Sequence, residues 1–211
     1  MENASKALLM AASVLVALII IGVLVWMFTS ISNTQQTEAD SEEIKIMTEY
    51  NNKIERFNAS GLYGSEILSL ANLIEDYNIR QAEFQGYSEI TLTVRINAIP
   101  VAEVFTSTEY TDENLISTYE TLNNRIDEMV RKTYANGRSI SYFAGLRTNE
   151  LEQIKAQYPG DAEIQNIEVT IDEYNSLKSE MTQFKTKRFG TPVVEYDNNT
   201  ARITSMIFTE V

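Results

Sequence analysis

The chain has 211 residues, a net charge of −13, and neither cysteine nor histidine. The missing cysteines exclude disulfides, thiolate metal sites and a cysteine nucleophile, and the missing histidines remove the commonest general base and metal ligand. An acidic surface repels phosphate backbones, so we expect no nucleic acid among its partners.

The first predicted element is an apolar helix over residues 7–28. The stretch contains no charged residue and no proline. At about 1.5 Å per residue, a helix of this length matches the roughly 30 Å hydrocarbon core of a bilayer. Trp26 and Phe28 lie at one end, where aromatic rings sit among lipid headgroups. We therefore expect a single membrane-spanning helix that contacts lipid through residues 7–28. A cleaved signal peptide, whose apolar region is usually shorter, is the alternative.

Positive charges beside the apolar stretch predict its orientation. Lys6 precedes the stretch, and the next positive residue after it is Lys45. Because positive residues near a span favour the cytoplasmic side, we expect the N-terminus in the cytoplasm and the rest of the chain outside the cell membrane.

Small residues recur along the first half of the predicted span. Ala7 and Ala11 are four residues apart, and so are Ser13 and Ala17. Since helices in lipid associate where small residues allow close backbone approach, these four residues form a hypothetical contact face between membrane helices. A plain anchor without helix association is the alternative.

Residues 34–59 are predicted to form a spacer and a stalk helix. The segment is polar and acidic up to Glu43, without the glycine and ligand spacing of a calcium loop. Met47, Tyr50, Ile54 and Phe57 then follow heptad spacing. Two heptads are too few for a coiled coil, so we expect this helix to pack on its own domain.

Residues 60–211 are predicted to form one soluble extracytoplasmic domain. Helical periodicity and caps predict helices over residues 66–77, 111–134 and 172–187, and a short helix that starts at a capping box of Asn149 and Glu152. Alternating apolar residues predict strands over residues 87–98, 101–108, 139–144 and 164–171. The segments 192–196 and 202–208 flank a turn at 197–200 and predict a β-hairpin.

The predicted fold class is α+β. An N-terminal transmembrane helix (residues 1–33 with its arm) and a helical stalk (34–59) precede helices packed on a mainly antiparallel sheet that ends in the hairpin. No catalytic, cofactor or metal site is expected. Ser176 and Lys178 miss the S-x-x-K spacing by one residue, and the glycines near Ser65 lack the lysine of a phosphate-binding loop.

Three segments carry a resemblance to known proteins: the N-terminal MENASKAL, residues 57–78 (FNASGLYGSEILSLANLIEDYN) and residues 193–208 (VVEYDNNTARITSMIF). They resemble a group of uncharacterised single-pass bacterial membrane proteins. The resemblance implies an anchored surface protein and brings no catalytic residue or ligand with it.

The order of polar arm, apolar helix and mixed head is also similar to type IV pilins and pseudopilins. The glycine before their cleavage point and the glutamate within their apolar helix are missing here. We therefore expect a membrane-anchored extracytoplasmic structural or interaction protein, not an enzyme, whose partner is itself or another envelope protein. The alternative is a pilin-like or pseudopilin-like subunit of a surface filament or secretion assembly.

Overall fold

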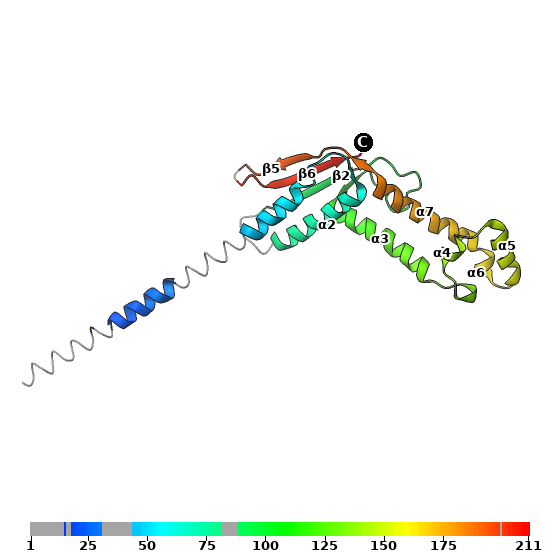
Figure 1. The fold of residues 1–211 in the computed structure, drawn as a ribbon, viewed down its shortest axis with the longest axis horizontal. Coiled ribbons are helices and arrows are strands. Elements are labelled where there is room, and N and C mark those ends of the chain that lie inside the picture. The colour runs from blue at the N-terminus through cyan, green and yellow to red at the C-terminus, as the bar shows by residue number, and fades with distance from the viewer. Residues whose placement is uncertain (1–14, 16–17, 31–43, 82–87, 199) are drawn as a thin grey trace, which may run out of the picture. The chain divides into compact units, whose positions relative to one another are not determined.

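The computed structural model describes residue 15 and residues 18–30, 44–81, 88–198 and 200–211 (Figure 1). The chain divides into two compact units, Met1–Glu49 and Tyr50–Val211. The second unit contains the sheets and the long helices of an α+β fold, as the sequence predicts.

In the first unit, residues 18–30 form a helix whose side chains are all exposed. Near its end, the Thr29 hydroxyl donates to the backbone carbonyls of Val25 at 3.0 Å and Trp26 at 2.9 Å. Across the described part of the chain, no helix combines the length and the apolar character needed to cross a membrane. Much of the predicted span 7–28 lies outside the described residues.

The predicted stalk helix covers residues 44–55, and Tyr50 and Ile54 on its apolar stripe are buried. The next helix, α2 (Gly64–Gln81), is longer than predicted at both ends. It follows β1 (Leu62–Tyr63), which pairs with β4 (Arg188–Phe189) in a small antiparallel sheet.

The start of α2 lies against the end of α7 (Ile167–Thr186). A Cβ atom on Gly64 would lie 2.0 Å from the backbone oxygen of Phe184, so only glycine fits here without a backbone shift.

The larger sheet has four strands in the order β3-β2-β6-β5. These are β2 (Thr91–Arg95), β3 (Glu109–Thr111), β5 (Val193–Tyr196) and β6 (Ile203–Thr209). The strands β2 and β6 run parallel, whereas the other two pairs are antiparallel, so the sheet is mixed. The antiparallel pair β5–β6 is the predicted hairpin.

One face of this sheet is buried, and α2 and α3 (Asp112–Arg131) lie beneath it (Figure 1). Leu92 is paired with Met206 and Val94 with Phe208, and all four side chains are buried. Thr91 and Arg95, on the other face of β2, are exposed, which is the period-two pattern of a half-buried strand.

The helices α3 and α7 lead away from the sheet, and three short helices gather at their far end (Figure 1). These are α4 (Ile140–Phe143), α5 (Thr148–Gln157) and α6 (Ala162–Gln165). A 3-10 turn, η1 (Ala135–Gly137), follows α3. This end has a buried apolar cluster of its own, made by Tyr134, Ile140, Phe143, Leu151, Ile164, Ile167 and Tyr174.

Three predicted strands are wrong. Residues 139–144 contain α4, and residues 164–171 contain the end of α6 and the start of α7. Within α7 the alternating apolar residues point in different directions: Ile167 is buried, whereas Val169 is 71% exposed. Residues 101–108 form a loop, in which the backbone N–H groups of residues 103–105 bind a side chain of α7 instead of a neighbouring strand.

The predicted start of α5 is also shifted. The backbone N–H of Arg147 donates to the Glu150 carboxylate at 2.8 Å, and the N–H of Glu150 donates back to the Arg147 carbonyl at 3.0 Å. The reciprocal cap therefore joins Arg147 and Glu150, two residues before the predicted pair of Asn149 and Glu152.

Candidate functional site

The predicted contact face of Ala7, Ala11, Ser13 and Ala17 lies outside the described residues. Within the described part of the chain, no group of three or more acidic side chains is placed to hold a metal ion. The candidate sites therefore come from the hollows of the unit Tyr50–Val211.

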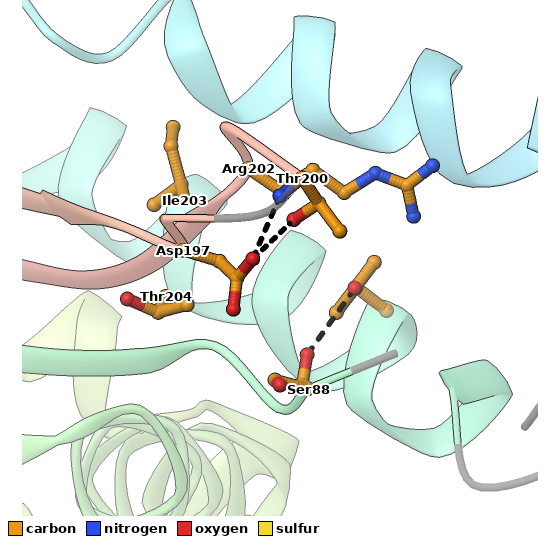
Figure 2. Close-up of a pocket in the computed structure, with 7 residues that line it drawn as sticks. Ser88, Asp197, Thr200, Arg202, Ile203 and Thr204 are labelled. Carbon is orange, nitrogen blue, oxygen red and sulfur yellow. Dashed lines mark hydrogen bonds between the residues drawn. The ribbon is translucent and has the colours of Figure 1, made fainter. Parts of the chain in front are cut away.

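A small hollow lies beside the turn between β5 and β6 (Figure 2). Its volume of about 30 Å³ holds no more than a water molecule or two. One Asp197 carboxylate oxygen accepts the Thr200 backbone N–H at 2.8 Å and the Thr200 hydroxyl at 3.0 Å. On the other side, the Tyr77 hydroxyl donates to the Ser88 carbonyl at 3.3 Å. The hollow is therefore a small gap beside hydrogen bonds that stabilise the turn, and it is too small for a ligand larger than water.

The second hollow lies on α3 beside the loop 101–108, and a buried acid holds that loop in place. The Glu180 carboxylate of α7 is fully buried and accepts the backbone N–H groups of Glu103 and Val104, both at 3.0 Å, and of Phe105. The Phe105 ring stacks on Phe184 with centroids 4.6 Å apart. The loop is thus fixed by hydrogen bonds and packing.

This second hollow has a volume of about 310 Å³ and polar walls. The Arg125 guanidinium donates to the carboxylates of Glu103 and Glu173, both at 3.0 Å, and its hydrogen bond to Glu173 is the main reason why the pKa of Arg125 is raised. Two carboxylates therefore neutralise the one cation of the wall. The Ser176 hydroxyl lies 3.5 Å from Glu103, which is too long for a nucleophile poised on its base.

The third hollow is a groove of about 280 Å³ between α7 and the segment from α4 to α5, called here the α5–α7 groove. One wall is mostly apolar and the other is a stripe of α7 with two acids. Its lining residues are Phe143, Ala144, Leu146, Thr148, Leu151, Glu168, Ile171, Asp172 and Asn175.

The two acids of the α5–α7 groove differ in their partners. The carboxylate of Glu168 lies 3.2 Å from the Lys155 ammonium, which also pairs with Glu152. The hydrogen bonds that Lys155 donates to Glu168 and Glu152 raise the pKa of Lys155. The side chain of Asp172 is exposed and makes no hydrogen bond or ion pair with another described residue. The groove therefore keeps one uncompensated negative charge at its rim.

The predictions from sequence missed this groove because part of each wall, residues 139–144 and 164–171, was assigned to a strand. A signal was present: Glu168, Ile171, Asp172 and Asn175 follow the spacing of one helix face. The alternation of Ile167, Val169 and Ile171 concealed it.

Comparison of this chain with protein-family models, with curated proteins and with solved structures gives no match.

Proposed function

We propose that this chain is a single-pass, membrane-anchored protein whose folded unit lies outside the cytoplasm and acts by binding another envelope component. The observation that carries the proposal is the exposure of the apolar helix. The large apolar side chains from Leu18 to Phe28 are between 48% and 73% exposed. Such a surface is unfavourable in water at about 25 cal/mol per Å², and lipid would remove this cost.

A binding role agrees with the chemistry of the three hollows. The second hollow offers a doubly paired arginine, and the hydroxyls of Ser117 and Thr121 in its wall donate to backbone carbonyls of α3. The α5–α7 groove combines apolar and acidic walls, which suit recognition better than a covalent step.

Membrane fractionation of the native host tests the anchor. The full-length chain should stay with membranes after an alkaline carbonate wash. Replacing Ile20 and Leu24 by aspartate should release it, since an aspartate at the centre of a span costs about 2.5–3.5 kcal/mol and Ile20 lies near the centre of residues 7–28. The matched control replaces Ile20 by leucine and Leu24 by isoleucine, and it should stay bound. Release of the wild-type chain into the carbonate wash would overturn the proposal.

Protease added to intact protoplasts tests the orientation. The unit Tyr50–Val211 should be cut while a cytoplasmic marker protein stays intact. Digestion only after lysis would place this unit inside and contradict the proposed orientation.

A filament subunit remains the alternative, because a pilin-like assembly also uses an exposed apolar N-terminal helix. Shearing of whole cells separates the two functions. A filament subunit would appear in bulk in the sheared fraction, whereas an anchored protein would remain with the cells.

A further inference from the structure

The α5–α7 groove is the described hollow in which an apolar wall faces an unpaired charge. The buried Phe143 and Leu151 form its floor, and Ala144, Leu146 and Ile171 are partly exposed above them. Phe143 and Leu151 belong to the apolar cluster of this end of the molecule, against which Leu146 and Ile171 pack. The floor is therefore held by a packed core.

The negative charge of the groove favours a positively charged occupant. Glu168, Asp172 and Asn175 lie on the same face of α7 at spacings of four and three residues, so they border the groove along its length. Lys155 pairs with both Glu168 and Glu152, whereas the side chain of Asp172 has no partner among the described residues. A cation placed over the groove would pair with Asp172 while its apolar part lies on the floor.

The volume of the groove favours side chains of a larger partner over a whole small-molecule ligand. Pockets for whole small-molecule ligands usually measure about 300–1,000 Å³. The α5–α7 groove, at about 280 Å³ and open to solvent, suits one or two inserted side chains of a larger partner. A second copy of this chain is disfavoured, because both copies would carry a net charge of −13.

We propose that the α5–α7 groove binds a basic, apolar segment of a partner protein, in which a leucine-sized side chain fills the groove and a neighbouring lysine or arginine pairs with Asp172. The inference deepens the proposed binding function and does not depend on the membrane anchor. Apolar insertion gives affinity, and the charge gives specificity and faster association.

Three synthetic hexapeptides test the proposal on the full-length chain in phosphatidylcholine nanodiscs, with empty discs as the blank. One alternates leucine and lysine, the second serine and lysine, and the third leucine and glutamate. The leucine–lysine peptide should bind, and the other two should bind at least about tenfold more weakly, because each lacks one of the two complementary features. Equal binding of the serine–lysine peptide would reduce the effect to general charge attraction and overturn the proposal.

Matched variants locate the peptide. Asp172→Asn should weaken binding of the leucine–lysine peptide about threefold, the usual size for a solvent-exposed ion pair. The control Asp127→Asn removes an exposed acid of α3 whose side chain makes no hydrogen bond or ion pair with other described residues, and it should leave binding unchanged. An equal loss in both variants would mean that only the net charge matters.

Filling the groove tests the apolar part. Ala144→Gln should reduce binding at least about tenfold while the thermal melting of the chain stays the same. Should this variant melt earlier, Thr148→Gln replaces it, because Thr148 lines the groove from an exposed position. Full binding in a folded, groove-filled variant would overturn the proposal, as would self-association of the chain that is abolished by the same substitution. Carbonate-wash fractionation is independent of these results, so failure of the groove leaves the anchor to be judged separately.

Discussion

The carboxylate of Glu180 accepts the backbone N–H of Val104 at 3.0 Å, although 76 residues separate the two in sequence. The N–H groups of Glu103 and Phe105 bind the same carboxylate. A charged side chain is stable in a fully buried position only when such donors replace water. In a strand, these N–H groups would donate to the carbonyls of a neighbouring strand. Here the Glu180 carboxylate accepts them instead, so residues 101–108 need no strand partner.

Replacing Glu180 by alanine should lower the free energy of unfolding by about 3 kcal/mol or more, because three backbone donors, one of them buried, lose their acceptor. Glu180→Gln should cost less, since one oxygen remains. Denaturant unfolding of both variants measures the effect. The control Glu120→Ala, an exposed acid of α3, should stay within about 0.5 kcal/mol of wild type. A small loss for Glu180→Ala would show that the loop does not depend on this carboxylate.

Gly64 gives a second prediction, from close packing between α2 and α7. In Gly64→Ala the new Cβ would meet the Phe184 carbonyl at 2.0 Å, so backbone must move. We expect a loss of about 1–3 kcal/mol, the usual cost of overpacking. Gly160→Ala is the matched control, because nothing lies within 4 Å of its Cβ position. Thermal melting should separate the two variants, and an equal effect would contradict the close approach.

The salt bridge between Lys187 and Glu210 gives a third prediction. Their side chains are only 11% and 13% exposed, and Nζ lies 2.7 Å from the carboxylate. Glu210 also accepts the Asn97 backbone N–H at 2.6 Å, which ties the chain end to the segment after β2. Glu210→Ala should cost about 3 kcal/mol, because it leaves a shielded ammonium unpaired.

The exposed pair of Arg95 and Glu109 is the comparison for that variant. Its N–O distance is similar, 2.8 Å, but the side chains are 53% and 59% exposed. Glu109→Ala should therefore cost less than about 1 kcal/mol, and added salt should abolish most of this loss. Urea unfolding at low and high salt measures both variants. Equal losses would show that burial does not control the strength of these bridges.

The sequence predicted correctly those parts of the fold in which the local residue pattern favours the same secondary structure that packing requires. Thr111 accepts the N–H of Asn114 as the cap of α3, as predicted, although at 3.4 Å. The alternation of Leu92 and Val94 and the Asp197 turn of the hairpin were also confirmed. For the cap and the turn, residues close in sequence supply both the pattern and the partner. The strand β2 was predicted from its own alternation, although its partner β6 is distant in sequence.

The errors occurred where the partner is distant in sequence. The loop at Val104 depends on Glu180, and no local pattern reports a buried acid on another helix. Around Ile167 and Val169, the sequence fits both the alternation of a strand and the spacing of a helix. The structure is helical, with Ile167 packed in the apolar cluster and Val169 exposed. The α5–α7 groove is lined by residues of α4, α5 and α7, so its lining could not be predicted while parts of α4 and α7 were assigned to strands.

The last prediction concerns pH and the pair of Tyr50 and Asp76. The Tyr50 hydroxyl donates to the Asp76 carboxylate, and Arg80 lies 3.3 Å from the other oxygen. The Tyr50 hydrogen bond is the largest cause of a pKa of Asp76 below its ordinary value of 3.8, and the charge of Arg80 adds to it. Because a carboxyl with a lowered folded-state pKa stabilises the fold only when ionised, this contribution is present above 3.8 and is lost as pH falls through the folded-state pKa.

Asp76→Asn should therefore lower stability at neutral pH and have little effect in strong acid. The side chain of Asp76 is half-exposed, so solvent screening limits the expected loss to below about 1 kcal/mol. Urea unfolding of wild type and variant across the acid range measures the difference. The Asp127→Asn control should give a difference that is small at every pH. A loss for Asp76→Asn that persists at the lowest pH would mean that shape, and not the charge of the carboxylate, holds Tyr50.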